Sequence, residues 1–308
     1  MKTVLVTGCN GFIGQNLVKK LTNEFKVIGI DNFVSSSKAN LVNLNKLKNF
    51  NFIEQDIIYL EQIDDKIDYI FNLACPASPP KYQSNPIFTL ETNFIGTHNL
   101  LKLAKKNNAI LIQASTSEVY GDPEVHPQVE TYKGNVNTIG KRSCYDEGKR
   151  VAETLCYEYR KNYNIKAKIV RIFNTYGPGM DSKDGRVISN FMVNTINKTP
   201  LVIYGDGSQT RSFCFIDDMV EALIQCMHID FDFPINLGNE NEISLNELVD
   251  IFNKTFGINK TKYIESVEDD PNIRKPDISR AKKILNWEPR TNIKDGLEQT
   301  YNYFKKTI

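Results

Sequence analysis

The sequence lacks both a long apolar run and an excess of either charge. Its 308 residues include 38 basic and 37 acidic side chains, which gives a formal net charge of +1. This balance provides no long-range attraction to a nucleic-acid backbone or to an anionic membrane, so we expect neither partner. No apolar stretch approaches the roughly 20 residues of a membrane-spanning helix. The apolar run "TVLV" begins at residue 3, which leaves no room for a signal peptide.

The cysteines show no C-x-x-C pair and no other spacing typical of a zinc or redox motif. The six are scattered along the chain, at Cys9, Cys75, Cys144, Cys156, Cys214 and Cys226. We therefore assign no metal site. Reduced, unpaired cysteines fit a cytoplasmic protein, which is the location that we expect.

Short apolar runs alternate with stretches of helical periodicity in the first half of the chain. The run "KTVLVTG" is rich in β-branched residues and ends in glycine, as a buried parallel strand does. Further strand-like runs include "FKVIGID", "IDYIFNLA", "NAILIQAS" and "KAKIVRIFN", and a helical pattern covers 86–106. This alternation predicts an α/β fold, a Rossmann-like doubly wound parallel sheet, with a smaller mixed domain after it.

Three glycines follow the first predicted strand at the spacing G-x-x-G-x-x-G, in "TGCNGFIG". Gly8 permits a tight turn, Gly11 lets a pyrophosphate approach backbone amides, and Gly14 lets helix pack on strand. Asp31 closes the next strand, where a carboxylate accepts hydrogen bonds from ribose hydroxyls and repels a 2′-phosphate. The pattern favours NAD over NADP. A plain turn for the glycines and a capping role for Asp31 are the alternatives.

Asp56 follows the third predicted strand, where it would flank the adenine; a solvated loop acid is nearly as good an interpretation. We place the NAD-binding domain at 1–176 and a mainly substrate-binding domain at 177–308. The turn-rich stretch "NTYGPGMDSKDGR" marks the change. A strand near 234–238, in "FPINLGNE", is expected to rejoin the first domain.

Tyr145 and Lys149 lie four residues apart, so on a helix they share one face. A nearby ammonium should lower the pKa of the phenol, which would then take a proton from a substrate alcohol. Thr116 ends the predicted strand "NAILIQAS" and its continuation, where its hydroxyl would orient that alcohol. Each feature alone is weak: Y-x-x-x-K arises by chance, and a strand-end hydroxyl commonly caps a turn.

The blocks that carry a family resemblance span nearly the whole chain: "TGCNGFIG", "LACPASPPKY", "ASTSEVYGDPEVHPQ", "CYDEGKRVAE", "RIFNTYGPGM", "GDGSQTRSFCFIDD" and "DDPNIRKPDISRAKKILNWEP". They resemble the extended short-chain dehydrogenases/reductases, and within them the UDP-glucuronic acid decarboxylase (UDP-xylose synthase) family. The resemblance implies NAD-dependent decarboxylation of UDP-glucuronate to UDP-xylose through a 4-keto intermediate, with NAD regenerated in the site. It also implies a homodimer, formed through the 86–106 helix and the Tyr145 helix.

The resemblance further implies the residues around the cofactor. We assign NAD contacts to Gly8, Gly11, Phe12, Ile13, Gly14, Asp31, Asn32, Asp56, Ile57, Leu73, Cys75, Tyr145 and Lys149. Cys75 stands where relatives often have serine, so only a hydroxyl contact differs. The assigned catalytic residues are Thr116, Glu118, Tyr145 and Lys149.

The triplet Thr116, Ser117, Glu118 separates the expected reaction from its relatives. In the similar sugar-nucleotide 4,6-dehydratases the middle residue is an aspartate that protonates the departing hydroxyl, and the glutamate removes the proton on carbon 5. Ser117 is a poor proton donor, so loss of water lacks its acid. Loss of carbon dioxide needs no such acid. We expect Tyr145 and Thr116 to stabilise the resulting enolate, and a water held by Glu118 to protonate carbon 5.

Anionic UDP-sugars need cations of defined geometry, and a guanidinium suits them. By resemblance we assign substrate contacts to Asn174, Arg186, Tyr204, Arg211 and Arg274. Arg274 would serve either the diphosphate or the sugar carboxylate. Surface ion pairs for the arginines, and core packing for Tyr204, are the alternatives. Another nucleotide-sugar 4,6-dehydratase or 4-epimerase, or a non-catalytic nucleotide-sugar-binding protein, remain alternative functions.

Overall fold

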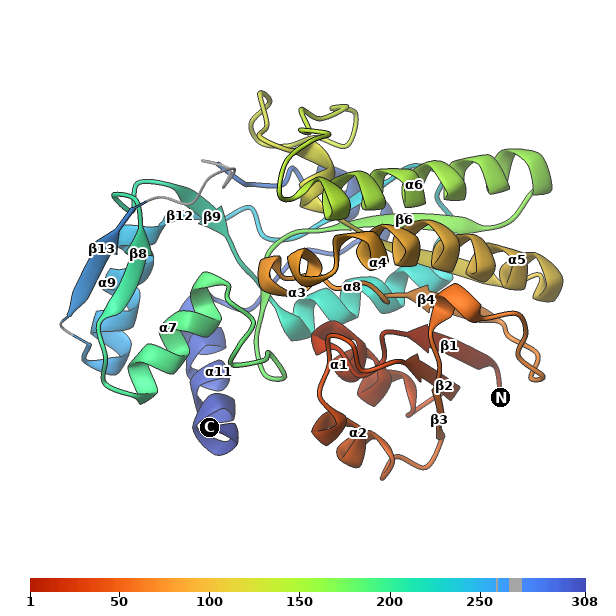
Figure 1. The fold of residues 1–308 in the computed structure, drawn as a ribbon, viewed down its shortest axis with the longest axis horizontal. Helices are drawn as coiled ribbons and strands as arrows, with labels where there is room; N and C mark the ends of the chain where they lie inside the picture. The colour runs from red at the N-terminus through yellow and green to blue at the C-terminus, as the bar shows by residue number, and fades with distance from the viewer. Residues whose placement is uncertain (259, 266–272) are drawn as a thin grey trace.

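A seven-stranded parallel sheet forms the centre of the computed structural model, which describes residues 1–258, 260–265 and 273–308 (Figure 1). The strand order is β11-β6-β5-β4-β1-β2-β3, and neighbouring strands run parallel. The strands are β1 Thr3–Thr7, β2 Lys26–Asp31, β3 Phe50–Glu54, β4 Tyr69–Asn72, β5 Ile110–Thr116, β6 Ala167–Ile172 and β11 Ile235–Leu237. This arrangement confirms the predicted Rossmann-like α/β fold.

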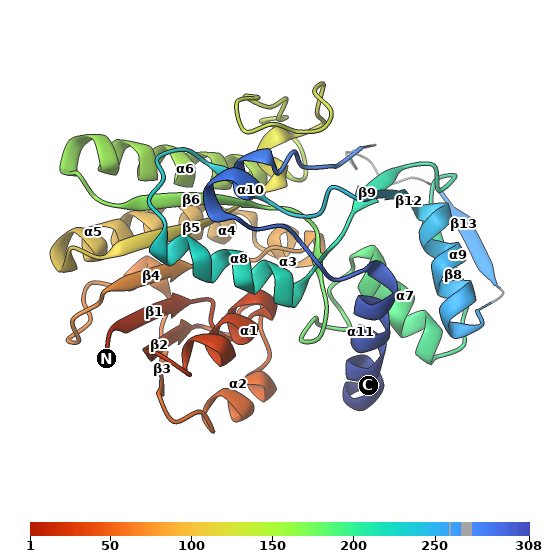
Figure 2. The same ribbon diagram turned by 180° about the vertical axis from the view of Figure 1, so that it is seen from behind.

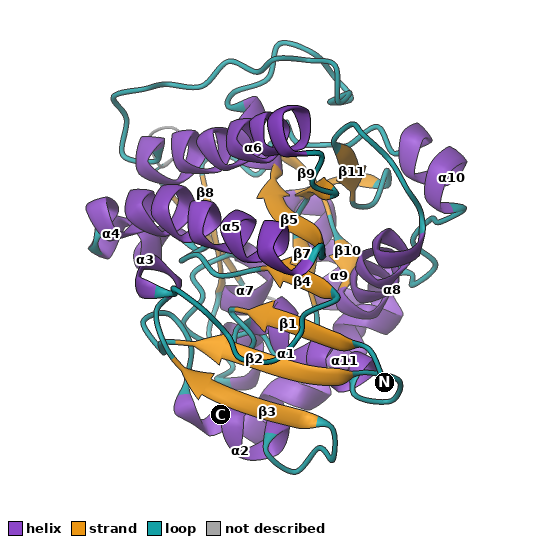
Figure 3. Cartoon of the chain, turned by 90° about the vertical axis from the view of Figure 1, so that its right-hand side faces the viewer, coloured by secondary structure: helices purple, strands orange, loops and turns teal. Residues whose placement is uncertain are grey.

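Alternating residues of the strands face two separate layers of helices. Val4 and Val6 of β1 pack in one apolar core with the helices α1 and α8, while Leu5 packs in the other with α5 and α6. Figure 3 shows these helices on opposite sides of the strands. Their bounds are α1 Phe12–Leu21, α8 Ile216–His228, α5 Thr97–Asn107 and α6 Ser143–Tyr163. Both faces of the sheet are covered, as the continuous apolar runs require.

The strand order changes direction between the neighbours β1 and β4. The connection that follows β1 and the connection that follows β4 turn to opposite faces of the sheet. A crevice therefore opens between them at the carboxyl ends of these two strands. The segments at this edge are α2 Lys38–Leu44, η1 Ile57–Tyr59, α3 Pro79–Ser84 and η3 Ser117–Tyr120. The predicted helix over 86–106 is continuous but irregular, since α4 Pro86–Glu91 joins α5 through a π-helical turn at Thr92–Gly96.

The second half of the chain builds a smaller mixed lobe beside this edge (Figure 2). It contains α7 Val187–Ile196, β8 Leu201–Tyr204, β9 Thr210–Ser212, β12 Glu242–Ser244, α9 Leu245–Phe256, β13 Thr261–Ile264 and α11 Ile293–Thr307. Strand β13 pairs with β8, and β12 pairs with β9. The short strands β7 Thr175–Tyr176 and β10 Cys214–Phe215 pair where the chain passes between the lobe and the sheet.

Besides α8, two further segments of the second half return to the sheet. Strand β11 pairs with β6, and helix α10 Ser279–Leu285 packs beside it. Trp287 is buried and its indole N–H donates to the carbonyl oxygen of Asp218, so this side chain belongs to the core. The division into domains at residue 176 stays a prediction. Among the described residues, no helix combines the length and the apolarity that crossing a membrane requires.

Candidate active site and cofactor cleft

The turn between β1 and α1 accepts only glycine at two of its positions. Gly8 has a φ of +67°, and a Cβ there would lie 2.7 Å from the carbonyl oxygen of Leu73. A Cβ on Gly14 would lie 2.1 Å from the carbonyl oxygen of Gly8. Helix α1 begins at Phe12, and its N-cap, Gly11, offers no side chain to the first-turn amides. These amides have no partner within the helix, so the turn suits an anion such as a pyrophosphate.

A hollow of about 490 Å³ opens beside this turn, at the carboxyl edge of β1, β2 and β4. Its walls include eight of the assigned cofactor residues: Gly8, Gly11, Asp31, Asn32, Asp56, Ile57, Leu73 and Cys75. Phe12, Ile13 and Gly14 form the first turn of α1 next to it. Sequence reasoning missed further wall residues, among them Val34, Ser35, Gln55, Phe88 and Thr92. The cradle and its acidic wall fit a dinucleotide.

Asp31 is buried at the end of β2 and holds the next loop in place. Its carboxylate accepts hydrogen bonds from the backbone N–H groups of Asn10 (3.0 Å) and Phe33 (2.9 Å) and from the Ser36 hydroxyl (2.9 Å). Asp56 also caps backbone, since it accepts from the N–H of Ile58 at 2.8 Å. The capping role that we considered as the alternative for Asp31 is therefore present. A ribose contact for Asp31 and an adenine contact for Asp56 stay predictions.

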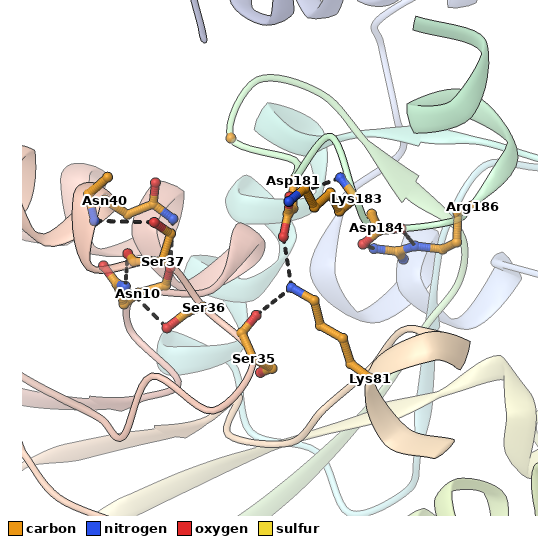
Figure 4. Close-up of polar contacts among 12 residues, drawn as sticks. Asn10, Ser35, Ser36, Ser37, Asn40, Lys81, Asp181, Lys183, Asp184 and Arg186 are labelled. Atoms are coloured by element: carbon orange, nitrogen blue, oxygen red, sulfur yellow. Dashed lines mark hydrogen bonds and ion pairs between the residues drawn. The ribbon is translucent and has the colours of Figure 1, made fainter. Parts of the chain in front are cut away.

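Lys81 joins two loops at the rim of the cleft (Figure 4). Its ammonium donates to the carbonyl oxygen of Ser35, from the loop after β2, at 2.7 Å, and to the carboxylate of Asp181 at 2.8 Å. Asp181 belongs to the loop between β7 and α7, so one side chain of α3 connects the cofactor loop with the start of the smaller lobe. In the same loop Arg186 forms a bidentate ion pair with Asp184.

Tyr145, Lys149 and Thr116 come together where β5 ends beside α6. Tyr145 is buried and shares a side-chain hydrogen bond with Thr116. The Lys149 ammonium lies 5.7 Å from the centre of the Tyr145 ring and donates to the carbonyl oxygen of Ala114 at 2.9 Å. The expected lowering of the phenol pKa is wrong. Burial raises the pKa of Tyr145, and burial also lowers the pKa of Lys149.

The Glu118 carboxylate lies between two arginines, Arg142 and Arg274. Of these two, only Arg274 was predicted from the sequence to belong to the site, as a substrate contact. The backbone N–H of Glu118 is capped by the Thr116 hydroxyl, which directs the residue into the site. The two terminal guanidinium nitrogens of Arg274, Nη1 and Nη2, donate to the Glu118 carboxylate. Arg142 donates to the same carboxylate. Burial alone would raise the pKa of Glu118, but the two guanidiniums outweigh burial and hold it below its usual range. Glu118 is thus an ionised carboxylate.

The position of Arg142 in the sequence could have indicated that it belongs to the site. It precedes Tyr145 by three residues, so it lies on the same face of the start of α6. Arg274, in contrast, comes from a segment 156 residues after Glu118. The first residues of its block, 269–272, lie outside the described residues.

Of the other assigned substrate residues, Asn174 lies between β6 and β7, and Tyr204 and Arg211 lie in the smaller lobe. The carbonyl oxygen of Asn174 accepts from the N–H of Cys214 at 2.9 Å, and Arg211 in β9 is buried and donates to the carbonyl oxygen of Thr210 at 2.8 Å. Tyr204, at the end of β8, is 43% exposed, which excludes core packing as its role. Substrate contacts for these residues stay predictions. No group of three possible metal ligands occurs among the residues that the structure describes.

Comparison with known proteins gives the family. A family profile described as GDP-mannose 4,6 dehydratase matches residues 5–300. The chain is 48% identical over 307 residues to UDP-glucuronic acid decarboxylase 1 of Arabidopsis thaliana, covering 99% of this chain and 70% of that protein. It is 46% identical to UDP-glucuronic acid decarboxylase 1 of Xenopus tropicalis, covering 100% of this chain and 73% of that protein. The chain belongs to the UDP-glucuronic acid decarboxylase family.

Solved structures of related enzymes share the fold over almost the whole chain. UDP-glucuronic acid 4-epimerase from Bacillus cereus, in complex with UDP-glucuronic acid and NAD, is 29% identical with a TM-score of 0.90, covering 99% of this chain and 100% of that chain. UDP-glucose 4-epimerase from Thermotoga maritima, with UDP-glucose, is 30% identical with a TM-score of 0.91, covering 99% of both chains. These similarities confirm the expected place of this decarboxylase-family chain among the extended short-chain dehydrogenases/reductases.

Proposed function

We propose that this protein is an NAD-dependent decarboxylase that converts UDP-glucuronate to UDP-xylose through a 4-keto intermediate. The observation that carries the proposal is the identity of nearly half of all residues with UDP-glucuronic acid decarboxylases over the whole chain. The geometry supports it, because Thr116, Tyr145 and Lys149 meet beside a dinucleotide-sized cleft, with Glu118 and Arg274 close to them.

The cofactor-binding residues are those of the glycine turn and the cleft. The first-turn amides of α1 would hold the pyrophosphate, and Asp31 and Asp56 would form the wall for the adenosine half. Lys81 keeps the loop at Ser35 closed against the rim. When bound, NAD supplies the reversible hydride acceptor for carbon 4 of the sugar. Because the hydride returns to the sugar, NAD should stay in the site through many turnovers.

Tyr145 is the base for the 4-hydroxyl proton in this proposal. Thr116, which already shares a hydrogen bond with the phenol, holds the reacting oxygen against it. Burial disfavours the phenolate, so the proton transfer must be matched by positive charge near the ring. Lys149 provides part of that charge from the next turn of α6. The same phenol returns the proton when carbon 4 is reduced again.

The cluster around Glu118 favours an acidic sugar. Two guanidiniums, Arg142 and Arg274, face one ionised carboxylate, Glu118, in a buried site. The planar guanidinium of Arg274 also suits a second carboxylate, and the carbon-6 carboxylate of UDP-glucuronate is the one that the substrate offers. We therefore place Arg274 near the sugar carboxylate rather than the diphosphate. Once carbon dioxide leaves, this attraction is lost, which favours product release.

The competing functions differ at the same residues. A 4,6-dehydratase would need an acid where Ser117 stands. A 4-epimerase is favoured by the structural neighbours, which include 4-epimerases at 29–30% identity. A non-catalytic binding protein would be free to lose Thr116, Tyr145 or Lys149, and all three are present and assembled.

Product analysis separates these functions. The purified protein is incubated with UDP-glucuronate without added NAD, and products are identified by mass spectrometry. UDP-xylose together with released carbon dioxide is the expected result. A UDP-uronate of changed C4 configuration would establish the epimerase, and a 4-keto-6-deoxy product from a neutral nucleotide sugar would establish the dehydratase. Binding of NAD with no turnover of any nucleotide sugar would favour the binding protein.

A homodimer and a cytoplasmic location complete the proposal. Apolar side chains are exposed on α4 and the π-helical turn, at Ile87 (69%) and Phe94 (49%), and on α6 at Tyr157 (57%). Helices α4 and α6 pack side by side, so these side chains provide a surface for a second copy of the chain. Light scattering should give the mass of a dimer, and Phe94→Glu should reduce the measured mass to that of a monomer.

The proposed cytoplasmic location is supported by the cysteines. All six cysteines are free, which fits a reducing compartment.

A further inference from the structure

The segment that carries Arg274 has an irregular backbone, although the side chain that it presents is buried. Residues 273–278, all of them described, lie between β13 and α10 and form no helix or strand, and Arg274 is only 5% exposed. Pro276 of this segment forms an isolated parallel bridge with Gln128, in the loop between η3 and α6. A functional side chain on such a segment keeps its place only if neighbouring residues fix the backbone.

Gln128 binds the backbone on both sides of Pro276. Its own N–H donates to the carbonyl oxygen of Lys275 at 2.8 Å, and its side-chain Oε1 accepts from the N–H of Lys275 at 2.9 Å. Its carbonyl oxygen accepts from the N–H of Asp277 at 2.9 Å. The side-chain amide is itself fixed, because Nε2 donates to the carbonyl oxygen of Val125 at 3.0 Å and the residue is buried. Both polar groups of the Lys275 backbone are therefore held by this one residue.

The peptide unit between Arg274 and Lys275 is held at both of its polar ends. Its N–H, from Lys275, donates to Oε1 of Gln128. Its carbonyl oxygen, from Arg274, accepts from the Ser212 hydroxyl of β9 at 3.4 Å. Because a peptide unit is planar, contacts at opposite ends restrict its rotation, and with it the direction in which the Arg274 side chain leaves the backbone. That direction leads to Glu118, to which the guanidinium donates twice.

Asn236 of β11 attaches this arrangement to the central sheet. Its buried side chain donates to the carbonyl oxygens of Gln128 at 2.9 Å and of Asp277 at 3.1 Å. Its Oδ1 accepts from the Tyr120 hydroxyl at 2.7 Å, and Tyr120 belongs to η3, the element that carries Glu118. Both sides of the buried ion pair are thus attached to the same strand of the sheet.

The exact position of this backbone matters because of the shape of a guanidinium. A bidentate contact requires the guanidinium and the carboxylate to be nearly coplanar, so a small rotation of the Arg274 backbone would break one of its two hydrogen bonds to Glu118. In the proposed function the same guanidinium also faces the carbon-6 carboxylate of the sugar. A displaced backbone should therefore weaken the binding of UDP-glucuronate, while NAD, bound at the glycine turn, should be retained.

We propose that Gln128 is a positioning residue for recognition of the sugar carboxylate, an inference that rests on the proposed function. Gln128 fixes the peptide unit of Arg274 and thereby directs the guanidinium toward Glu118 and the substrate. It acts through Arg274 and not through a contact of its own with the sugar. Loss of the Gln128 amide should therefore affect substrate binding only while Arg274 is present.

The test measures binding in protein that carries Tyr145→Phe, so that UDP-glucuronate is not consumed during a titration. Isothermal titration calorimetry gives the Kd of UDP-glucuronate and of UDP for Gln128→Met, Arg274→Ala and the double variant. We expect Gln128→Met to weaken UDP-glucuronate by about 10-fold, the size of a lost hydrogen bond, while the Kd of UDP stays within roughly twofold. The double variant should bind UDP-glucuronate no more weakly than Arg274→Ala alone.

Two further variants separate positioning from a general loss of structure. Gln128→Asn keeps the amide but withdraws it by one carbon from the Lys275 N–H, so it should weaken UDP-glucuronate with the same selectivity over UDP. Gln225→Met is the matched control, because this glutamine of α8 donates to Glu221 of its own helix. It should bind both ligands as the parent protein does.

Several outcomes would overturn the inference. They are unchanged binding of UDP-glucuronate by Gln128→Met, an equal weakening of UDP and UDP-glucuronate, additive losses in the double variant, and an unchanged Kd in Arg274→Ala. A wild-type protein that releases no carbon dioxide from UDP-glucuronate would instead overturn the proposed function.

Discussion

Asp146→Asn should stabilise the protein at alkaline pH relative to the wild type, whatever reaction the site performs. Burial and Glu118 raise the pKa of Asp146 from 3.8 to about 7 in the folded protein. A carboxyl whose pKa is raised by folding favours the folded state at a pH below its unfolded pKa. That advantage is lost as the pH rises through the folded pKa, because the folded protein must then ionise a buried group.

The size of the effect follows from the two pKa values. Between about pH 5 and about pH 8, ionisation of Asp146 costs the folded wild type a further 2 kcal/mol or so, since each pKa unit corresponds to about 1.4 kcal/mol. Asparagine does not titrate, so the variant is spared this cost. In a chain of this size the difference is roughly 4 °C in melting temperature.

The assay is thermal or urea unfolding of wild type and variant at both pH values. The melting temperature of Asp146→Asn should rise relative to that of the wild type as the pH is raised. Glu158→Gln, at an exposed position of the same helix, serves as the matched control. If the difference between Asp146→Asn and wild type were the same at both pH values, Asp146 would be ionised throughout. The inference that burial and Glu118 keep this carboxyl protonated near neutral pH would then be refuted.

Three further predictions test the rest of the site. Tyr145→Phe should retain NAD and lose turnover by about 100-fold or more, measured as kcat; unchanged turnover would remove the phenol as the base. Gly14→Ala should lower the melting temperature, because its Cβ would lie 2.1 Å from a backbone oxygen, whereas Gly11→Ala, with its nearest contact at 3.3 Å, should be milder. Lys81→Met should speed the release of NAD during gel filtration, because it removes the contact between two rim loops; equal retention would contradict that role.

The fold was predictable because its signals are local in the sequence. The β-branched run at β1, the glycines and the periodicity of α1 lie within one short segment, and each restricts the backbone independently. The meeting of Thr116 with Tyr145 also followed from chain order, because β5 and α6 are successive elements of a doubly wound sheet. Residues at the carboxyl edge of such a sheet must lie near one another.

The ionisation of the site was not predictable, because it depends on groups that are distant in the chain. Arg274 contacts Glu118 although 156 positions separate the two residues in the sequence, and no local sequence pattern predicts that contact. The expectation that Lys149 lowers the pKa of Tyr145 considered the distance between the two residues but not their burial. In the folded protein burial is the larger influence on both side chains. Patterns of residue types give neighbours on a helix face, whereas the charge state of a buried group requires every neighbour.

Ser117 and Asp146 lie in different electrostatic surroundings, although both are close to Glu118. An aspartate at Ser117 would adjoin Glu118 in η3, within reach of two arginines that already hold one carboxylate ionised. It would compete with the sugar carboxylate for those guanidiniums. On α6, Asp146 instead experiences burial and the repulsion of Glu118 more strongly than the attraction of the arginines, so it keeps its proton. One charged cluster thereby holds the Glu118 carboxylate ionised and keeps a neighbouring carboxyl protonated near neutral pH.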